Sequence, residues 1–141
     1  MPIATITYKN HTFRYKEKGN GLNRFVLTVV RDYVNQHKPI TFNQLKLVFP
    51  DSLQNNTARR ETVPLGVFAT FERAEAIRSK DRWRYFSDAH IALLDGVIVV
   101  TGEWASEGSR CNLPRFIEKV QELGESLQVH YREPVAKTTL A

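Results

Sequence analysis

The fold is decided by residues 20–36, which read NGLNRFVLTVVRDYVNQ. Apolar side chains recur there at intervals of three and four residues, the spacing of one face of an α-helix. They are Leu22, Phe25, Val26, Val29, Val30, Tyr33 and Val34. Asn20 stands where a side chain could cap the first turn. Valine has only modest helix propensity, so we expect this helix to be held by packing against a core.

A β-hairpin is expected before this helix and a second helix after it. Residues 3–16 alternate between apolar and polar side chains, with a polar break at residues 9–11, as in two antiparallel strands. Thr41 and Gln44 have the spacing of a capping box, in which each side chain satisfies the other residue's amide. This pair predicts a short helix from Phe42 to about Val48, which Pro50 ends.

The middle of the chain combines a polar loop, a third helix and a second hairpin. Residues 51–65 are polar and without periodicity, so we expect an exposed loop. Thr70 can cap a helix over residues 71–79. From residue 83 the period is two, which predicts a strand at 83–86 and a hairpin over 91–104 that turns at Asp95-Gly96.

The chain closes with a helix and a strand. Asn112 is the expected cap of that helix, Pro114 fits its first turn, and Gly124 is its stop. Residues 127–131 can add a last strand. These patterns predict one α+β domain over residues 1–134, followed by a flexible tail at 135–141. Residues 22–104 have the order of a winged-helix-like core, three helices and a β-hairpin wing, flanked by the N-terminal β-hairpin and the C-terminal helix and strand.

Composition narrows the class of protein. A chain of 141 residues with 42% apolar side chains suits a single domain with a real core. One cysteine, Cys111, rules out an internal disulfide and a cysteine-based zinc cluster. No stretch is apolar enough to cross a bilayer and the start does not resemble a signal peptide, so we expect a cytoplasmic protein without membrane contact.

Charge is distributed unevenly along the chain. Residues 1–84 hold 15 basic and 7 acidic side chains, a balance of +8, whereas residues 85–141 hold 5 and 8, a balance of −3. Such asymmetry favours an anionic partner such as nucleic acid, although a merely solvated basic surface gives the same count.

The third helix and its flanks are the candidate nucleic-acid-binding site. Basic side chains there could contact phosphates, and a tryptophan among them could stack on bases or anchor the sheet instead. The predicted residues are Arg59, Arg60, Arg73, Arg78, Lys80, Arg82, Trp83 and Arg84. The acidic residues Glu72, Glu75 and Asp81 dilute this basic site.

No reaction can be recognised in the sequence. The four histidines are scattered, without the spacing of metal ligands. A magnesium nuclease with the Asp…Glu-x-Lys pattern needs a lysine two residues after a carboxylate, and no acidic residue here has one. Asp88, Asp95 and Glu103 could still converge, but Asp95 is explained by its turn. We therefore expect a non-enzymatic protein without metal or cofactor, with a small metal-dependent nuclease as an alternative.

Several short motifs resemble a domain that recurs in uncharacterised bacterial proteins, alone or beside catalytic modules, in restriction and phage-defence systems. They are residues 40–54 (ITFNQLKLVFPDSLQ), Gly66-Val67, residues 84–86, residues 94–96, residues 116–119 and Leu123-Gly124. The chain departs from that pattern by inserting residues 55–65 and by reading TGEWA at 101–105, where the family has Asn-Gln-Trp-Gly. The resemblance implies a nucleic-acid or protein-docking module and transfers no catalytic residue.

Two hypotheses for a binding function follow from these patterns. The leading hypothesis is a winged-helix-like module that binds nucleic acid, with DNA as the expected form, through the third helix, the Arg59-Arg60 loop and the wing at Asp95-Gly96. The rival is a protein-interaction module or homodimer that uses exposed loops, such as residues 104–110, or an edge strand. Trp104 itself is interpreted as a core or rim residue.

Overall fold

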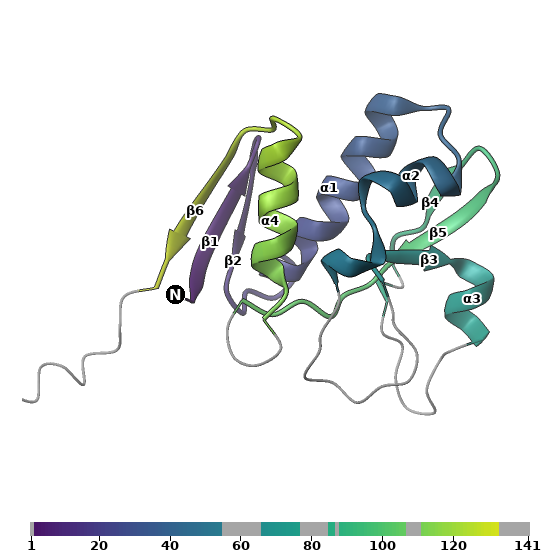
Figure 1. Ribbon diagram of the computed structural model, residues 1–141. Helices are drawn as coiled ribbons and strands as arrows, with labels where there is room; N and C mark the ends of the chain where they lie inside the picture. The colour runs from purple at the N-terminus through teal and green to yellow at the C-terminus, as the bar shows by residue number, and fades with distance from the viewer. Residues whose placement is uncertain (1, 55–65, 77–84, 87, 107–110, 133–141) are drawn as a thin grey trace, which may run out of the picture.

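The computed structural model describes residues 2–54, 66–76, 85, 86, 88–106 and 111–132. Within these ranges the chain is a mixed α+β protein with four α-helices and two three-stranded antiparallel sheets (Figure 1). The predicted α+β class is therefore confirmed. None of the helices in these ranges is long and apolar enough to cross a membrane.

The first sheet joins the two ends of the described chain. Strand β1 (Ile3–Tyr8) lies in the centre and pairs antiparallel with β2 (His11–Arg14) on one side and β6 (Leu127–Tyr131) on the other. The predicted N-terminal hairpin and last strand are both confirmed. Because β6 pairs with β1, the C-terminal helix before it is held against the N-terminal half of the molecule.

Helix α1 (Leu22–His37) is the predicted central helix and contacts both sheets and the last helix. Its stripe is buried as expected, except that Tyr33 is only partly buried. The predicted Asn20 cap is wrong, because Gly21 occupies the cap position and no side chain caps the helix. Asn20 belongs to the preceding turn, where its N–H donates to Glu17 O at 3.3 Å and its carbonyl accepts from Arg14 at 2.9 Å.

Helix α2 (Phe42–Val48) begins with the predicted capping box. Thr41 Oγ1 accepts from the Gln44 N–H at 3.2 Å, and Gln44 Oε1 accepts from the Thr41 N–H at 2.9 Å. After Pro50 the chain makes a short 3₁₀ turn, Asp51–Leu53, so the predicted loop begins with one ordered turn. Residues 55–65 of that loop lie outside the described ranges.

The second sheet has β5 (Gly96–Val100) in its centre, between β3 (Phe68–Thr70) and β4 (Ile91–Leu93). The hairpin predicted around Asp95-Gly96 is confirmed. Helix α3 (Phe71–Ala76) follows β3 directly, and the predicted cap Thr70 accepts from the Arg73 N–H through its Oγ1 at 3.1 Å. The expected continuation of α3 to residue 79 and the beginning of the strand at 83–86 lie outside the described residues.

Helix α4 (Leu113–Glu122) ends as the sequence predicts, since Gly124 has the left-handed φ of +79° that favours glycine in this position. Its beginning differs from expectation. Asn112 is the cap residue, but its side chain does not cap the helix. The amide is turned away from the helix, toward the backbone of two other segments.

Aromatic side chains join the helices in one core. Phe116 of α4 meets Phe25 of α1 edge-on at 5.7 Å between ring centroids and stacks on Phe49 at 5.6 Å. All three rings are fully buried. Helix α1 therefore lies between the two sheets, with α4 and α2 packed along it (Figure 1).

Candidate functional site

The predicted basic site is only partly described by the structure. Arg73 is exposed on α3, where its N–H donates to Thr70 Oγ1 at 3.1 Å and so fixes the first turn. Glu72 and Glu75 of the same short helix are exposed as well. The other predicted residues lie outside the described ranges, and they are Arg59, Arg60, Arg78, Lys80, Arg82, Trp83 and Arg84.

The chain on either side of residues 55–65, which include Arg59 and Arg60, is nevertheless fixed. Before them, Gln54 is buried and its Nε2 donates to Glu103 O at 3.1 Å. After them, Val67 is buried and its carbonyl accepts from the Thr101 N–H at 3.0 Å. Both ends are thus bonded to the chain that leaves β5, residues 100–106, which we call the 100–106 segment.

The described chain that follows residues 77–84, which include most of the other predicted basic side chains, is bonded to the same segment. Tyr85 directly follows them, is buried, and forms an isolated antiparallel bridge with Thr101. The next residue, Phe86, donates its N–H to Val100 O at 2.9 Å. Three of the four chain ends that flank the predicted basic stretches therefore hydrogen-bond to the 100–106 segment, and the fourth is α3, next to β3 of the same sheet.

Asn112 fixes the 100–106 segment by side-chain hydrogen bonds. It is 1% exposed, its Oδ1 accepts from the Ala105 N–H at 2.8 Å, and its Nδ2 donates to Gln54 O at 3.1 Å and to Glu103 O at 3.2 Å. One buried amide thus satisfies three backbone groups of two chain segments, an arrangement that is costly to leave incomplete.

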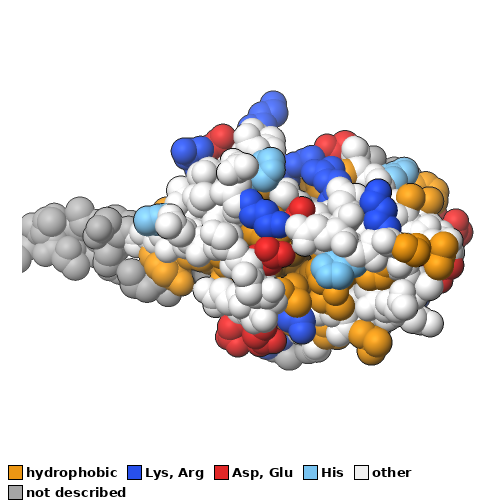
Figure 2. Space-filling view, turned by 90° about the horizontal axis from the view of Figure 1, so that it is seen from above, with side chains coloured by type: hydrophobic (Ala, Val, Ile, Leu, Met, Phe, Trp, Pro, Cys, Tyr) orange, Lys and Arg blue, Asp and Glu red, His pale blue; other side chains and the backbone are white. Residues whose placement is uncertain are grey.

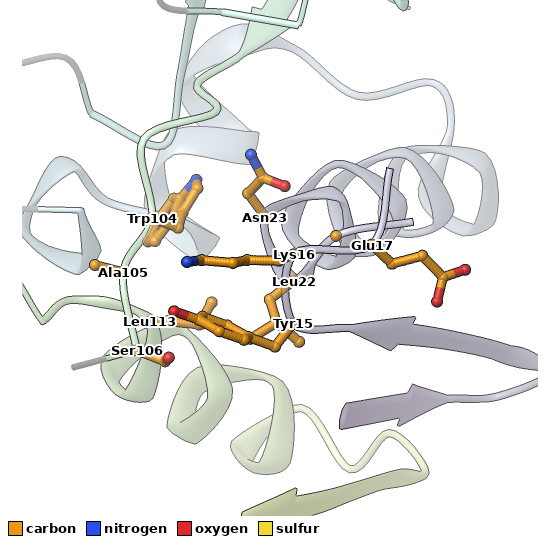
Figure 3. A pocket seen from close by; sticks show the side chains of 10 residues that line it. Tyr15, Lys16, Glu17, Leu22, Asn23, Trp104, Ala105, Ser106 and Leu113 are labelled. Atoms are coloured by element: carbon orange, nitrogen blue, oxygen red, sulfur yellow. The ribbon is translucent and has the colours of Figure 1, made fainter. Parts of the chain in front are cut away.

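A pocket of about 420 Å³ opens beside the end of this segment. Its walls come from the exit of β2, the start of α1, the 100–106 segment and the start of α4. The lining residues are Tyr15, Lys16, Glu17, Gly21, Leu22, Asn23, Trp104, Ala105, Ser106 and Leu113 (Figure 3).

The lysine of the pocket is held in an uncommon backbone conformation. Lys16 has φ +59°, in the left-handed region that a non-glycine residue seldom adopts. Its side chain crosses the pocket toward Ala105, between Tyr15 and Trp104 (Figure 3). Among the described residues, no carboxylate pairs with Lys16, because Glu17 points away and lies 3.6 Å from Arg14 instead.

The two aromatic rings of the pocket, Tyr15 and Trp104, are held by residues outside its lining. Trp104 donates its Nε1–H to Thr101 O at 2.9 Å and packs against Phe116 at 5.3 Å between ring centroids. The Tyr15 ring carries the Arg132 guanidinium 3.8 Å from its centroid. Both rings therefore keep their orientation without a ligand.

Several charged side chains elsewhere on the described surface are paired with one another. Figure 2 shows basic, acidic and histidine side chains interspersed over one face. Asp32 accepts from Lys9 Nζ and from the Tyr8 hydroxyl, both at 2.6 Å. Burial alone would raise the pKa of Asp32, but the hydrogen bonds from Lys9 and Tyr8 outweigh it and hold that pKa below its usual value.

Asp88, one of the three carboxylates that the nuclease alternative would use, is also paired with a basic side chain. Asp88 accepts from Arg24 at 2.8 Å, and this hydrogen bond lowers the pKa of its carboxyl. Asp95 accepts from the Phe42 N–H at 2.9 Å. In the part of the chain that the structure describes, no three His, Cys, Asp or Glu side chains lie together in a way that could hold a metal ion.

Sequence reasoning missed the pocket. The Tyr15-Lys16 pair stands at the end of the predicted hairpin, and Trp104 was expected in the core or at its rim, so nothing linked them. Trp104 does pack on the core, but its half-buried ring also forms a wall of the pocket. A tryptophan followed by polar residues just after a hairpin is the one signal that pointed there.

Comparison of the chain with protein-family models, curated protein sequences and solved structures gives no match. The resemblance to a bacterial defence-associated domain therefore stays a prediction.

Proposed function

We propose that this chain is a non-enzymatic bacterial module that binds nucleic acid, with DNA as the expected ligand. The observation that carries the proposal is that the described residues flanking both predicted basic stretches bond to the 100–106 segment or belong to its sheet and the helix after it. Arginine guanidinium groups make bidentate contacts with phosphate, and two stretches whose flanking residues bond to one segment can contact one nucleic-acid backbone together.

The described helices and second sheet support a winged-helix-like arrangement, in which α3 reads the nucleic acid and the β4–β5 turn is the wing. That turn is tied to the start of α2, because Leu94 donates its N–H to Ile40 O at 2.9 Å and Asp95 Oδ1 accepts from Phe42. Gly96 and Val97 at the turn are exposed. A wing fixed to the helices in this way can approach the ligand without first having to be ordered.

The test is a fluorescence-anisotropy titration of labelled duplex DNA, single-stranded DNA and RNA at several salt concentrations. Replacing Arg73, Arg78 and Arg82 together by glutamine removes up to three phosphate contacts, so the slope of log affinity against log salt should fall by about 2–3. The matched control replaces three basic residues on α1, at its end and on α4, namely Arg31, Lys38 and Lys119. The control should keep the wild-type slope.

An unchanged slope and affinity in the Arg73, Arg78, Arg82 variant would contradict the site, and no binding of any nucleic acid at low salt would contradict the function. The same titrations in magnesium and in manganese, followed by electrophoresis, test the nuclease alternative, which requires cleavage that depends on the metal.

A protein-interaction module is the second candidate, favoured by exposed apolar side chains near the wing. Leu47 on α2 is 82% exposed and Leu94 at the hairpin turn is 67% exposed. Figure 2 shows hydrophobic side chains exposed toward the end of the molecule where α2 and the β4–β5 hairpin lie in Figure 1. Sedimentation of wild-type protein and of Leu47→Glu would reveal self-association through this surface, which should not depend on salt.

A further inference from the structure

We propose that the pocket beside the 100–106 segment binds one unpaired nucleotide, its base against the rings of Tyr15 and Trp104 and its phosphate at Lys16. This inference rests on the proposed function and names the part of a nucleic acid that the pocket would take: a strand end or a nucleotide that has left the stack.

The volume of the pocket and its aromatic walls fit a single planar group. A volume of about 420 Å³ lies within the range of small-molecule pockets, roughly 300–1,000 Å³. Two aromatic residues, Tyr15 and Trp104, stand on either side of the Lys16 side chain (Figure 3), so a base that stacks on these rings takes the place of the lysine chain and its ammonium moves to the phosphate. Bases stack on such rings whatever their identity, but only when they are not already stacked in a duplex, so the expected ligand is unpaired.

The charge at the mouth of the pocket fits an anion. Among the described residues Lys16 has no carboxylate partner, and α1 begins at the pocket with Gly21 as its cap, without a capping side chain or an acidic residue in its first turn. The amides and the dipole of this 16-residue helix therefore add positive potential beside the lysine.

Polar groups on the remaining walls can bond the edge of a base. Asn23 lines the pocket, and its Nδ2 donates to Gly102 O at 3.1 Å, which fixes the start of α1 to the 100–106 segment. Ser106 lines the pocket and is 8% exposed. Among the described lining residues Glu17 is the one carboxylate, and it points outward (Figure 3), where it does not oppose a phosphate.

The chain offers a built-in reporter for this proposal. It has two tryptophans, so in a Trp83→Phe protein all tryptophan fluorescence comes from Trp104. Titration with deoxyadenosine monophosphate, and separately with a short single-stranded oligonucleotide, should change this fluorescence in a saturable way. Inorganic phosphate, which lacks a base, should bind at least about tenfold more weakly, the effect of losing some 1.4 kcal/mol of stacking.

Variants of Lys16 test the anion site. Lys16→Gln, made in the Trp83→Phe protein, should weaken nucleotide binding about tenfold, since it removes one charge-assisted hydrogen bond. Lys18→Gln removes an exposed charge from the same connector outside the pocket lining, and should change affinity less than about twofold. Lys16→Asn repeats the test with a residue that tolerates the left-handed backbone, in case the glutamine variant fails to fold.

The outcomes separate the two proposals. Oligonucleotides that bind with a steep salt dependence while Trp104 fluorescence and the Lys16 variants stay unchanged would overturn the pocket and leave the proposed function standing. A mononucleotide that binds at Trp104 while no oligonucleotide binds to the wild-type chain, which retains Trp83, would support the pocket and overturn the proposed function. Phosphate that binds as tightly as the nucleotide would overturn the role given to the aromatic walls.

Discussion

Two lysines of the N-terminal hairpin have nearly the same surroundings in the chain and different surroundings in space. Lys9, at the turn between β1 and β2, has φ +53°, and Lys16, at the exit of β2, has φ +59°. Each follows a tyrosine and places its ammonium near that ring, at 5.4 Å from Tyr8 and 5.3 Å from Tyr15. Local sequence therefore predicts one role for both.

Tertiary contacts give them different roles. Lys9 lies 2.6 Å from Asp32 and 3.5 Å from Glu125, so its charge is used within the fold and links the hairpin to α1 and to the turn before β6. Lys16 faces a pocket where no described carboxylate meets it. A charge that no described carboxylate neutralises, beside fixed aromatic rings, is available to a ligand, whereas a charge paired with carboxylates contributes to stability alone.

The largest effect is expected from removing the Asn112 side chain, which holds the 100–106 segment beside the pocket. Asn112→Ala leaves the Ala105 N–H and Gln54 O without their side-chain partner and Glu103 O with Gln54 Nε2 alone, so we expect a loss of about 3 kcal/mol in the free energy of unfolding. Urea denaturation followed by circular dichroism measures it. Asn35→Ala, on the exposed face of α1, is the control and should change stability by less than about 0.5 kcal/mol. A similar small change in both variants would show that Asn112 does not fix the segment.

A smaller effect is expected from Asp32, which pairs with Lys9 and Tyr8, and it should depend on pH. The folded-state pKa of Asp32 is lowered, so its contribution is fully present above the unfolded value of about 4 and is lost as pH falls through the lower folded value. At pH 7 we expect Asp32→Asn to be less stable than wild type by about 1–2 kcal/mol, because it loses charge-assisted bonds from Lys9 and Tyr8.

Denaturation series of both proteins between pH 7 and pH 2 measure this difference. The gap should be constant down to about pH 4 and then shrink as wild type protonates Asp32. A gap that stays the same at every pH would mean that the ionised carboxylate is not what stabilises the hairpin.

Elements with local signals could be predicted from the sequence. The stripe on α1, the capping box at Thr41 and Gln44, and the Asp95-Gly96 turn each depend on residues within a few positions, and the structure has all of them. The cap at Asn20 failed for a local reason too, because a glycine one residue later took that position and Asn20 was used in the turn before it.

The candidate site could not be predicted in the same way. The pocket exists because Lys16 and Trp104, far apart in the sequence, are brought together by α1, and no periodicity encodes that contact. Asn112 looked like a helix cap because its position is one, yet its amide bonds Ala105, Gln54 and Glu103, partners that only the tertiary fold supplies. Residue type and spacing predicted the candidate basic stretches, but not the segment to which the described residues flanking them bond.

The most direct test compares Lys9→Gln and Lys16→Gln side by side, each measured for thermal stability and for binding of a labelled single-stranded oligonucleotide at low salt. We expect Lys9→Gln to lower Tm by roughly 2–4 °C, the effect of an ion pair worth up to 1 kcal/mol, and to bind like wild type. Lys16→Gln should keep the wild-type Tm and lose about tenfold in affinity. Equal binding by the two variants, or a loss of stability without a loss of binding at Lys16, would contradict the assignment of one lysine to the fold and the other to the ligand.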